Sequence, residues 1–217
     1  MNPFGQDPPS LGSSDPGTTT SSLRLFIAVE LPDEARSAVS GAIEQVVESG
    51  VKNLRPMRPE TVHLTLKFLG DVPSNRVDEL VERVTPVARA RTPFSMALSG
   101  AGVFPSPAKT RVLWLGIGGD TKALCELYSG IEDAVAGLGF ARHRKPFSPH
   151  LTVARLDNRA SRADRFLAAK ALASVPHPDG VEIPVRSISI MRSILGRGGA
   201  THHRIASLAL GLLEHAE

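Results

Sequence analysis

The chain has 217 residues, 41% of them hydrophobic, which is enough for one substantial core that needs neither a disulfide nor a metal for its stability. Its formal net charge of +3 is a mild bias that fits an anionic ligand, and its single cysteine excludes an internal disulfide. It contains no apolar run of roughly 18 residues and no basic segment leading into an apolar one, so we expect no membrane span, no secretory signal and a cytoplasmic location.

The first residues differ in composition from the rest of the chain. Residues 1–22 are rich in Pro, Gly, Ser and Thr and too poor in hydrophobic residues to offset the entropy that ordering would cost. We therefore predict a disordered tail over 1–22 and a single folded domain over 23–217. The domain begins with a mostly apolar, β-rich run at 23–30, which indicates a well-buried strand.

Strands and helices then alternate. The helix predicted over 33–48 has acidic residues in its first turn and Gly50 just past its end. A strand follows at 63–70, where Gly70 closes it, and the next helix runs from about 75 to 91.

The remaining elements complete two similar halves. Further strands are predicted over 94–103, 111–117, 150–156, 183–195 and 204–210, with helices from about 120 to 138 and from 161 to 174. The last two strands form a hairpin through the turn at Gly196–Gly199. A phosphate cradle at the Gly-rich run 116–121 is an alternative, but its spacing matches no such pattern, and a tight turn with an Asp or Thr helix cap explains it.

One short pattern occurs twice, once in each half. His63 and Thr65 share one face of the first motif strand, and His150 and Thr152 share one face of the second. The opposite faces are apolar, with Leu64, Leu66 and Phe68 in the first strand and Leu151 and Val153 in the second. The order of elements reads as one unit used twice and predicts an α+β fold in which the polar faces of both motif strands line a cleft.

With these residues in view, the chain resembles the two-histidine (2H) phosphoesterase superfamily, and within it the bacterial RNA 2′,3′-cyclic phosphodiesterases, also called 2′-5′ RNA ligases (the LigT/ThpR family). The resemblance covers about 23 to 210, and its carriers are Arg24–Ala28, Pro59–Gly70, Arg111–Trp114 and Phe147–Arg155. It implies a bilobal fold of two pseudo-symmetric antiparallel β-sheets with helices on the outer faces and a central active-site groove where both histidine strands meet.

The paired histidines suit the chemistry that the resemblance implies. Opening a 2′,3′-cyclic phosphate needs a base that deprotonates water and an acid that protonates the departing ribose oxygen, and an imidazole with a reference pKa near 6.5 can do either. The residues alone leave the two roles open; following the family, His63 is assigned as general acid and His150 as general base. Thr65 and Thr152 can donate to the phosphate oxygens. Arg155 can add a charge-assisted contact, although its parity along an ideal strand opposes His150.

Several other side chains are weaker candidates. Phe147 and Trp114 are interpreted as packing residues rather than base-stacking ones. His203 stands where the family often has a Tyr and is kept as a candidate nucleotide contact. Phe147 is kept as a second candidate, although packing is the favoured interpretation of its ring. No further ligand completes a metal site at His202 and His203, and we expect neither a metal nor another cofactor. The basic run 142–145 is either a solvated loop or a collar beside a phosphate.

The expected function is metal-independent hydrolysis of RNA 2′,3′-cyclic phosphate ends to 2′-phosphomonoesters, with ATP-independent 2′-5′ ligation as the reverse reaction. The expected partners are RNA or oligonucleotide ends, with no membrane, and a monomer is expected. Alternatives are a phosphodiesterase for ADP-ribose cyclic phosphate or 2′-5′ oligonucleotides, a metal-dependent phosphodiesterase, and an RNA-end-binding protein without turnover.

Overall fold

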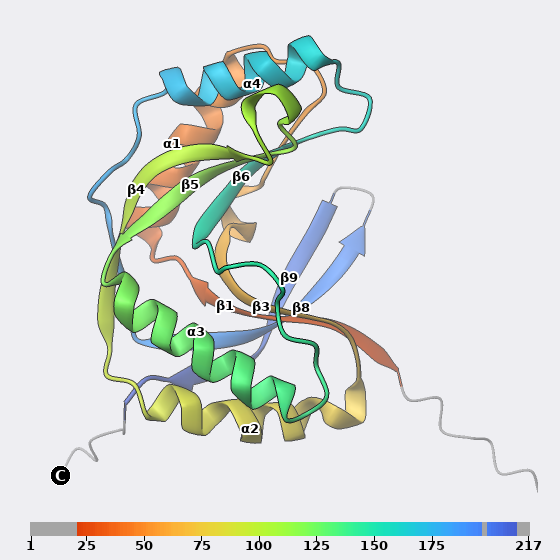
Figure 1. The fold of residues 1–217 in the computed structure, drawn as a ribbon, viewed down its shortest axis with the longest axis vertical. Helices are drawn as coiled ribbons and strands as arrows, with labels where there is room; N and C mark the ends of the chain where they lie inside the picture. The colour runs from red at the N-terminus through yellow and green to blue at the C-terminus, as the bar shows by residue number, and fades with distance from the viewer. Residues whose placement is uncertain (1–20, 197–198, 212–217) are drawn as a thin grey trace, which may run out of the picture.

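The computed structural model describes residues 21–196 and 199–211 (Figure 1). Residues 1–20 of the predicted tail lie outside this part, and the first strand already begins at Ser22, which pairs with Pro73. The strands are β1 (Ser22–Glu30), β2 (Leu54–Pro56), β3 (His63–Pro73), β4 (Phe94–Phe104), β5 (Val112–Gly119), β6 (His150–Leu156), β7 (Glu182–Val185), β8 (Ser187–Gly196) and β9 (Gly199–Ala209). The α-helices are α1 (Asp33–Glu48), α2 (Val77–Arg89), α3 (Thr121–Ala136) and α4 (Arg162–Ser174), and the short 3-10 helices are η1 (Pro59–Thr61), η2 (Ser74–Arg76) and η3 (Pro107–Lys109).

These strands form two antiparallel sheets, which confirms the predicted α+β class. The four-stranded sheet has the order β3-β1-β8-β9, and the five-stranded sheet has the order β2-β6-β5-β4-β7. Helices α2 and α3 pack against the four-stranded sheet, whereas α1 and α4 pack against the five-stranded sheet (Figure 1). The two motif strands therefore belong to different sheets, and β3 contacts β6.

The helix ends follow the predicted capping chemistry. The Asp120 side chain accepts a hydrogen bond from the Ala123 amide, so the Gly-rich run before it is a turn into a capped helix. Ser161 and Asp164 form a reciprocal capping box at the start of α4. Gly50, just past α1, has a φ of 69°, the left-handed conformation that glycine adopts without strain.

Strand predictions were wrong at 183–195, at 63–70 and at 204–210, where β9 already begins at Gly199, and one strand was missed. The apolar alternation at 183–195 belongs to two strands, because the chain crosses from β7 in the five-stranded sheet to β8 in the four-stranded sheet at Arg186. Ile183, Val185, Ile188 and Ile190 are all buried, so the sequence shows no break at the crossing. Strand β3 continues past Gly70 to Pro73, because Gly70 at φ 75° accommodates an irregularity in the pairing with β1. The short edge strand β2 was missed.

Candidate active site

The two motif histidines are held in the same way. His63 is the first residue of β3, and its Nδ1 lies 2.8 Å from the carbonyl oxygen of Thr61. His150 is the first residue of β6, and its Nδ1 lies 2.7 Å from the carbonyl oxygen of Ser148. A carbonyl oxygen can only accept, so each Nδ1 carries a proton and donates it. In its neutral form each ring therefore keeps Nε2 available to accept a proton and, once protonated, to donate one.

The surroundings of the two rings differ. The ring of His63 stacks on Phe26 at 4.6 Å between centroids and meets the edge of His202 at 5.0 Å. Burial, opposed by the Thr61 carbonyl and assisted by the charge of His202, lowers the pKa of His63 from 6.5 to about 4. Because of this low pKa, His63 is uncharged in the free protein at neutral pH. The ring of His150 instead meets the ring of Phe104 edge-on at 5.0 Å between centroids and lies 6.2 Å from the ring of Trp114.

A β-bulge interrupts the motif strand β3. Ala28 of β1 faces Thr65 and Ile27 faces Lys67, so Leu66 is an extra residue without a partner. Leu66 and Lys67 are consequently both buried, and Phe68 is 70% exposed. Phe68 lies 6.2 Å from Phe26, whose ring stacks on His63. The prediction that Phe68 lies on the apolar face is wrong, because the bulge turns it to the face that carries His63.

Strand β6 has a bulge at the same point of its motif. Trp114 of β5 faces Thr152 and Leu113 faces Ala154, so Val153 is the extra residue. Val153 and Ala154 are both buried, and Arg155 is exposed. Arg155 thereby returns to the face of His150 through the bulge and does not need to bend back at the strand end.

The two motifs therefore repeat in backbone geometry as well as in sequence. In each, the fourth residue is extra, and the sixth, Phe68 or Arg155, lies on the same face as the histidine and threonine. We call these surfaces of β3 and β6 the histidine faces. Thr65 and Thr152 are half-buried on them, two residues after their histidines. Nothing in the composition marks either bulge.

A charged network on the four-stranded sheet was also missed. The guanidinium of Arg204 donates from Nε and Nη2 to the two carboxylate oxygens of Glu30, each at 2.8 Å, and the Ser189 hydroxyl donates to the same carboxylate. The hydrogen bond from Arg204 holds the pKa of Glu30 below its usual range. Glu30 pairs with His63 across β1 and β3. The bidentate ion pair therefore holds β9, which carries Arg204, close to the start of the first motif strand.

The structure places His202, rather than His203, beside His63. The His202 ring lies 5.0 Å from both His63 and Phe26, and its Nδ1 is buried without a hydrogen-bond partner in the described residues. His203 is exposed, and the alternation of β9 directs it to the opposite face. The sequence could not distinguish these neighbours, because a strand register determines which of them faces His63.

Phe147 is a packing residue, as interpreted. Its ring stacks on Tyr128 of α3 at 4.0 Å with an interplanar angle of 8°, and it packs against the main core. The basic run 142–145 is partly held in place by contacts with α3, because Arg142 forms an ion pair with Asp133 and the His143 amide donates a hydrogen bond to Glu132.

Within 21–196 and 199–211, no three His, Cys, Asp or Glu side chains are grouped as metal ligands. None of the helices described is long and apolar enough to span a bilayer.

Trp114 borders His150 because Gly102 makes room for it. The two residues face each other across β4 and β5, and a Cβ added at Gly102 would collide with the indole ring. We expect Gly102→Ala to destabilise the protein by about 1 to 3 kcal/mol and to shift the fluorescence of Trp114, the only tryptophan in the sequence. The matched control is Gly41→Ala in α1, where a Cβ meets nothing within 4 Å. An unchanged spectrum and stability in Gly102→Ala would contradict this packing.

The lowered pKa of His63 predicts a dependence of stability on pH. Between pH 6.5 and about 4 the unfolded chain binds a proton at His63 that the folded chain does not bind. The free energy of unfolding should therefore decrease as the pH falls through this window, by at most about 1.4 kcal/mol per pH unit for this one group. Urea unfolding of the wild type and of His63→Phe at several pH values isolates the contribution. Identical slopes in the two proteins would show that His63 is not buried in its neutral form.

The sheet pairing and the repeated histidine strands place the protein in the two-histidine class of phosphoesterases. The family model described as "LigT like Phosphoesterase" matches residues 29–114 and 118–202, which include both motif strands. The chain belongs to this family.

Relatives and solved structures agree with that assignment. An RNA 2′,3′-cyclic phosphodiesterase of Methanothermobacter thermautotrophicus is 31% identical over 82% of this chain and 93% of its own length. The Geobacillus stearothermophilus protein of the same name is 39% identical over 60% of this chain but only 41% of its own length. The crystal structure of TT0787 from Thermus thermophilus superposes with a TM-score of 0.72 at 30% identity, covering 87% of this chain and 98% of that one. Escherichia coli LigT complexed with 3′-AMP has a TM-score of 0.68 at 24% identity, covering 87% of this chain and 98% of that one.

Proposed function

We propose that the protein is a metal-independent RNA 2′,3′-cyclic phosphodiesterase that works as a cytoplasmic monomer. The observation that carries the proposal is the matched pair of histidines on contacting strands, each with Nδ1 bound to the carbonyl two residues earlier and with no hydrogen bond to Nε2 from the described residues. The curated relatives carry this activity in their names. Two rings of one tautomer from two sheets suit an in-line displacement, which needs a proton acceptor and a proton donor on opposite sides of phosphorus.

In the proposed reaction, Nε2 of His150 accepts a proton from water while the water oxygen bonds to phosphorus. The bond between phosphorus and the ribose 3′ oxygen breaks, and Nε2 of His63 gives its proton to that oxygen. The product is a 2′-phosphomonoester with a free 3′ hydroxyl. Thr65, Thr152 and Arg155 donate to the non-bridging oxygens as charge redistributes. Ligation of 2′-5′ ends is the same path reversed, with the histidine roles exchanged.

Because the pKa of His63 is low in the free protein, the bound substrate has to favour protonation of this general acid. The free ring is neutral at pH 7, and a bound phosphate diester carries a negative charge that favours its protonated form. The pKa that His63 contributes to the kcat/KM profile, which reports the free enzyme, should therefore lie near 4, and its pKa in the kcat profile should move towards neutrality, because kcat reports the enzyme with substrate bound.

The positions of the aromatic side chains relative to the histidine faces indicate which of them can contact a nucleotide base. Phe68 presents an exposed ring next to Phe26 and is suited to stack on a base. The ring of Phe147 already stacks on Tyr128, and His203 faces away from His63, so neither is favoured as a base contact.

Hydrolysis of a nucleoside 2′,3′-cyclic phosphate in EDTA, followed by phosphorus NMR, tests the proposal. We expect full activity and the 2′-phosphate as product. A metal requirement, a 3′-phosphate product, or tight binding without turnover would overturn it. Rates on ADP-ribose cyclic phosphate and on 2′-5′ oligonucleotides rank the alternative substrates.

A substrate with sulfur in place of the 3′ oxygen separates the two histidine roles, since a thiolate leaves without protonation. We expect this substrate to restore turnover to His63→Ala but not to His150→Ala. Rescue of His150→Ala alone would reverse the assignment.

A further inference from the structure

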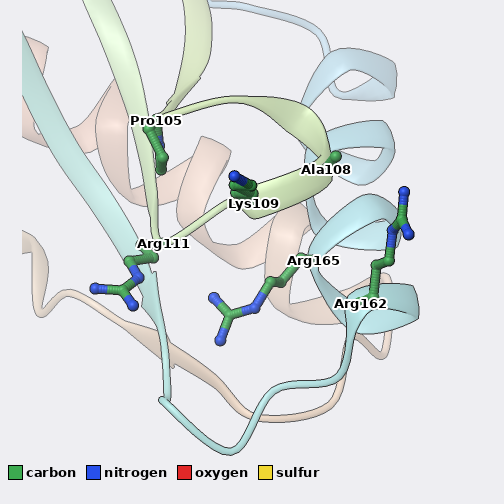
Figure 2. Close-up of a pocket in the computed structure, with 6 residues that line it drawn as sticks. All are labelled: Pro105, Ala108, Lys109, Arg111, Arg162 and Arg165. Atoms are coloured by element: carbon green, nitrogen blue, oxygen red, sulfur yellow. The ribbon is translucent and has the colours of Figure 1, made fainter.

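A basic pocket lies away from the histidines, between η3 and the start of α4. Its volume is about 460 Å³, and it is lined by Pro105, Ala108, Lys109, Arg111, Arg162 and Arg165 (Figure 2). In the view of Figure 2, the side chains of Arg111 and Arg165 lie below the loop that carries Lys109, whereas that of Arg162 lies on the α4 side and points away from them. Four of the six lining residues are cations and none is an acid.

The cations of this pocket are not neutralised by neighbouring carboxylates. Within 21–196 and 199–211, none of Lys109, Arg111, Arg162 and Arg165 forms a salt bridge. Arg165 is half-buried and fixed, because its guanidinium donates to the carbonyl oxygens of Thr110 at 2.6 Å and Asp157 at 3.3 Å. Both acceptors are uncharged carbonyls, so its positive charge remains available to an anion.

The pocket is connected to the proposed active site through β4, β5 and β6. Phe104, whose ring meets His150, directly precedes Pro105. The carbonyl of Arg111 accepts from the Leu156 amide at 2.9 Å, and Val112 pairs with Arg155. Arg155 therefore lies between the histidine and the pocket. Because Val153 is an extra residue in the bulge, β6 separates His150 from Leu156 by about five regular steps, roughly 17 Å at 3.3 Å per step.

We infer that this pocket binds an internucleotide phosphate of an RNA strand whose cyclic-phosphate end lies at the two histidines. The inference rests on the proposed function. Clustered arginines and lysines without acids favour phosphate oxygens, and contacts to the backbone supply affinity without sequence preference. A single nucleotide at His150 is too short to span roughly 17 Å along β6, whereas a strand of several nucleotides reaches the pocket by way of Arg155.

The test compares substrate lengths in a double variant. Lys109→Gln with Arg162→Gln removes two exposed charges that make no hydrogen bond in the described chain. On a nucleoside 2′,3′-cyclic phosphate, we expect unchanged kcat and KM. On a dodecanucleotide with the same end, we expect KM to rise about tenfold, and the slope of log KM against log salt to fall by about 1.4 for two lost contacts.

A matched double variant, Arg83→Gln with Arg89→Gln, removes the same charge from exposed sites on α2 and should leave the dodecanucleotide KM within twofold. Equal loss in both double variants would indicate a general charge effect and overturn the pocket assignment. A wild-type KM that does not depend on RNA length would also overturn it. An equal rise in KM for the mononucleotide would instead indicate a site for small phosphates.

Failure of the proposed function gives a different result. In that case the wild type would not hydrolyse the mononucleotide at all. Binding of an uncleavable dodecanucleotide, measured by fluorescence polarisation, would still report the pocket: weaker binding by Lys109→Gln with Arg162→Gln than by the α2 control supports it, and equal binding contradicts it.

Discussion

Replacing His63 or His150 by alanine is expected to lower kcat/KM on a 2′,3′-cyclic phosphate by about 10²- to 10⁴-fold. Each substitution removes one of the two proton-transfer groups, and positioned acids and bases contribute rate factors of this size. The double variant should be little worse than the poorer single variant, because the two groups act in one displacement and their effects are not additive. Steady-state kinetics on the three variants gives the values.

The control for this experiment is His177→Gln, since His177 lies in the loop after α4 and contacts the Leu172 carbonyl. Its kcat/KM should stay close to that of the wild type. Circular dichroism should show all variants folded. Should either alanine variant keep more than a tenth of the wild-type kcat/KM, that histidine is not an essential proton carrier.

The second large effect concerns folding. Lys67, on the bulge of β3, donates to both carboxylate oxygens of Glu132 at 2.8 and 2.9 Å and to the Ala141 carbonyl at 2.7 Å. The two side chains are only 5% and 7% exposed. Lys67→Met is expected to destabilise the protein by about 3 to 5 kcal/mol, because it leaves a buried carboxylate without its cation. Urea unfolding at pH 7 measures the loss.

The matched comparison is the double variant Lys67→Met with Glu132→Leu. Removing both charges should recover part of the loss, because no unpaired buried charge remains. Glu79→Gln, which removes an exposed ion pair with Arg76 and leaves the contacts of Arg76 with Leu138 in place, should cost less than about 1 kcal/mol. Equal costs for Lys67→Met and Glu79→Gln would mean that the buried pair does not stabilise the fold.

The buried pair also explains how α3 and the approach to the second motif are positioned. Glu132 accepts from the His143 amide, and the same helix supplies Tyr128, on which Phe147 stacks. One ion pair therefore connects the first motif strand, helix α3 and the segment that leads to His150. None of these contacts was predicted, because regular alternation would put Lys67 on the face of His63 and Thr65, and it is the bulge at Leu66 that buries it.

The local pattern was sufficient to predict most of the elements and the α+β class. Helix α1 and strand β6 have the predicted bounds, because an acidic first turn and Gly50 mark the ends of α1 and the repeated histidine motif marks β6. The errors occur where tertiary contacts decide the outcome. The bulges at Leu66 and Val153 are set by the partner strands, and the crossing at Arg186 separates two strands with continuous apolar alternation.

The candidate site was predictable where it depends on a local pattern and not where it depends on contacts between strands. The repeated pattern of histidine and threonine is local, so His63, Thr65, His150 and Thr152 could be found from the repeat together with its flanking residues. Phe68, His202 and the pairing of Glu30 with Arg204 depend on register between strands, which no single segment encodes. Arg155 was identified by resemblance, but the bulge that places it was not.

The most direct test of the account is a crystal structure of the protein with a nucleoside 2′-phosphate bound. We predict that Nε2 of His63 and Nε2 of His150 lie within hydrogen-bond distance of phosphate oxygens on opposite sides of one phosphorus, with Arg155 on a non-bridging oxygen. A phosphate bound elsewhere, or contacted by only one of the two rings, would contradict the two-histidine mechanism.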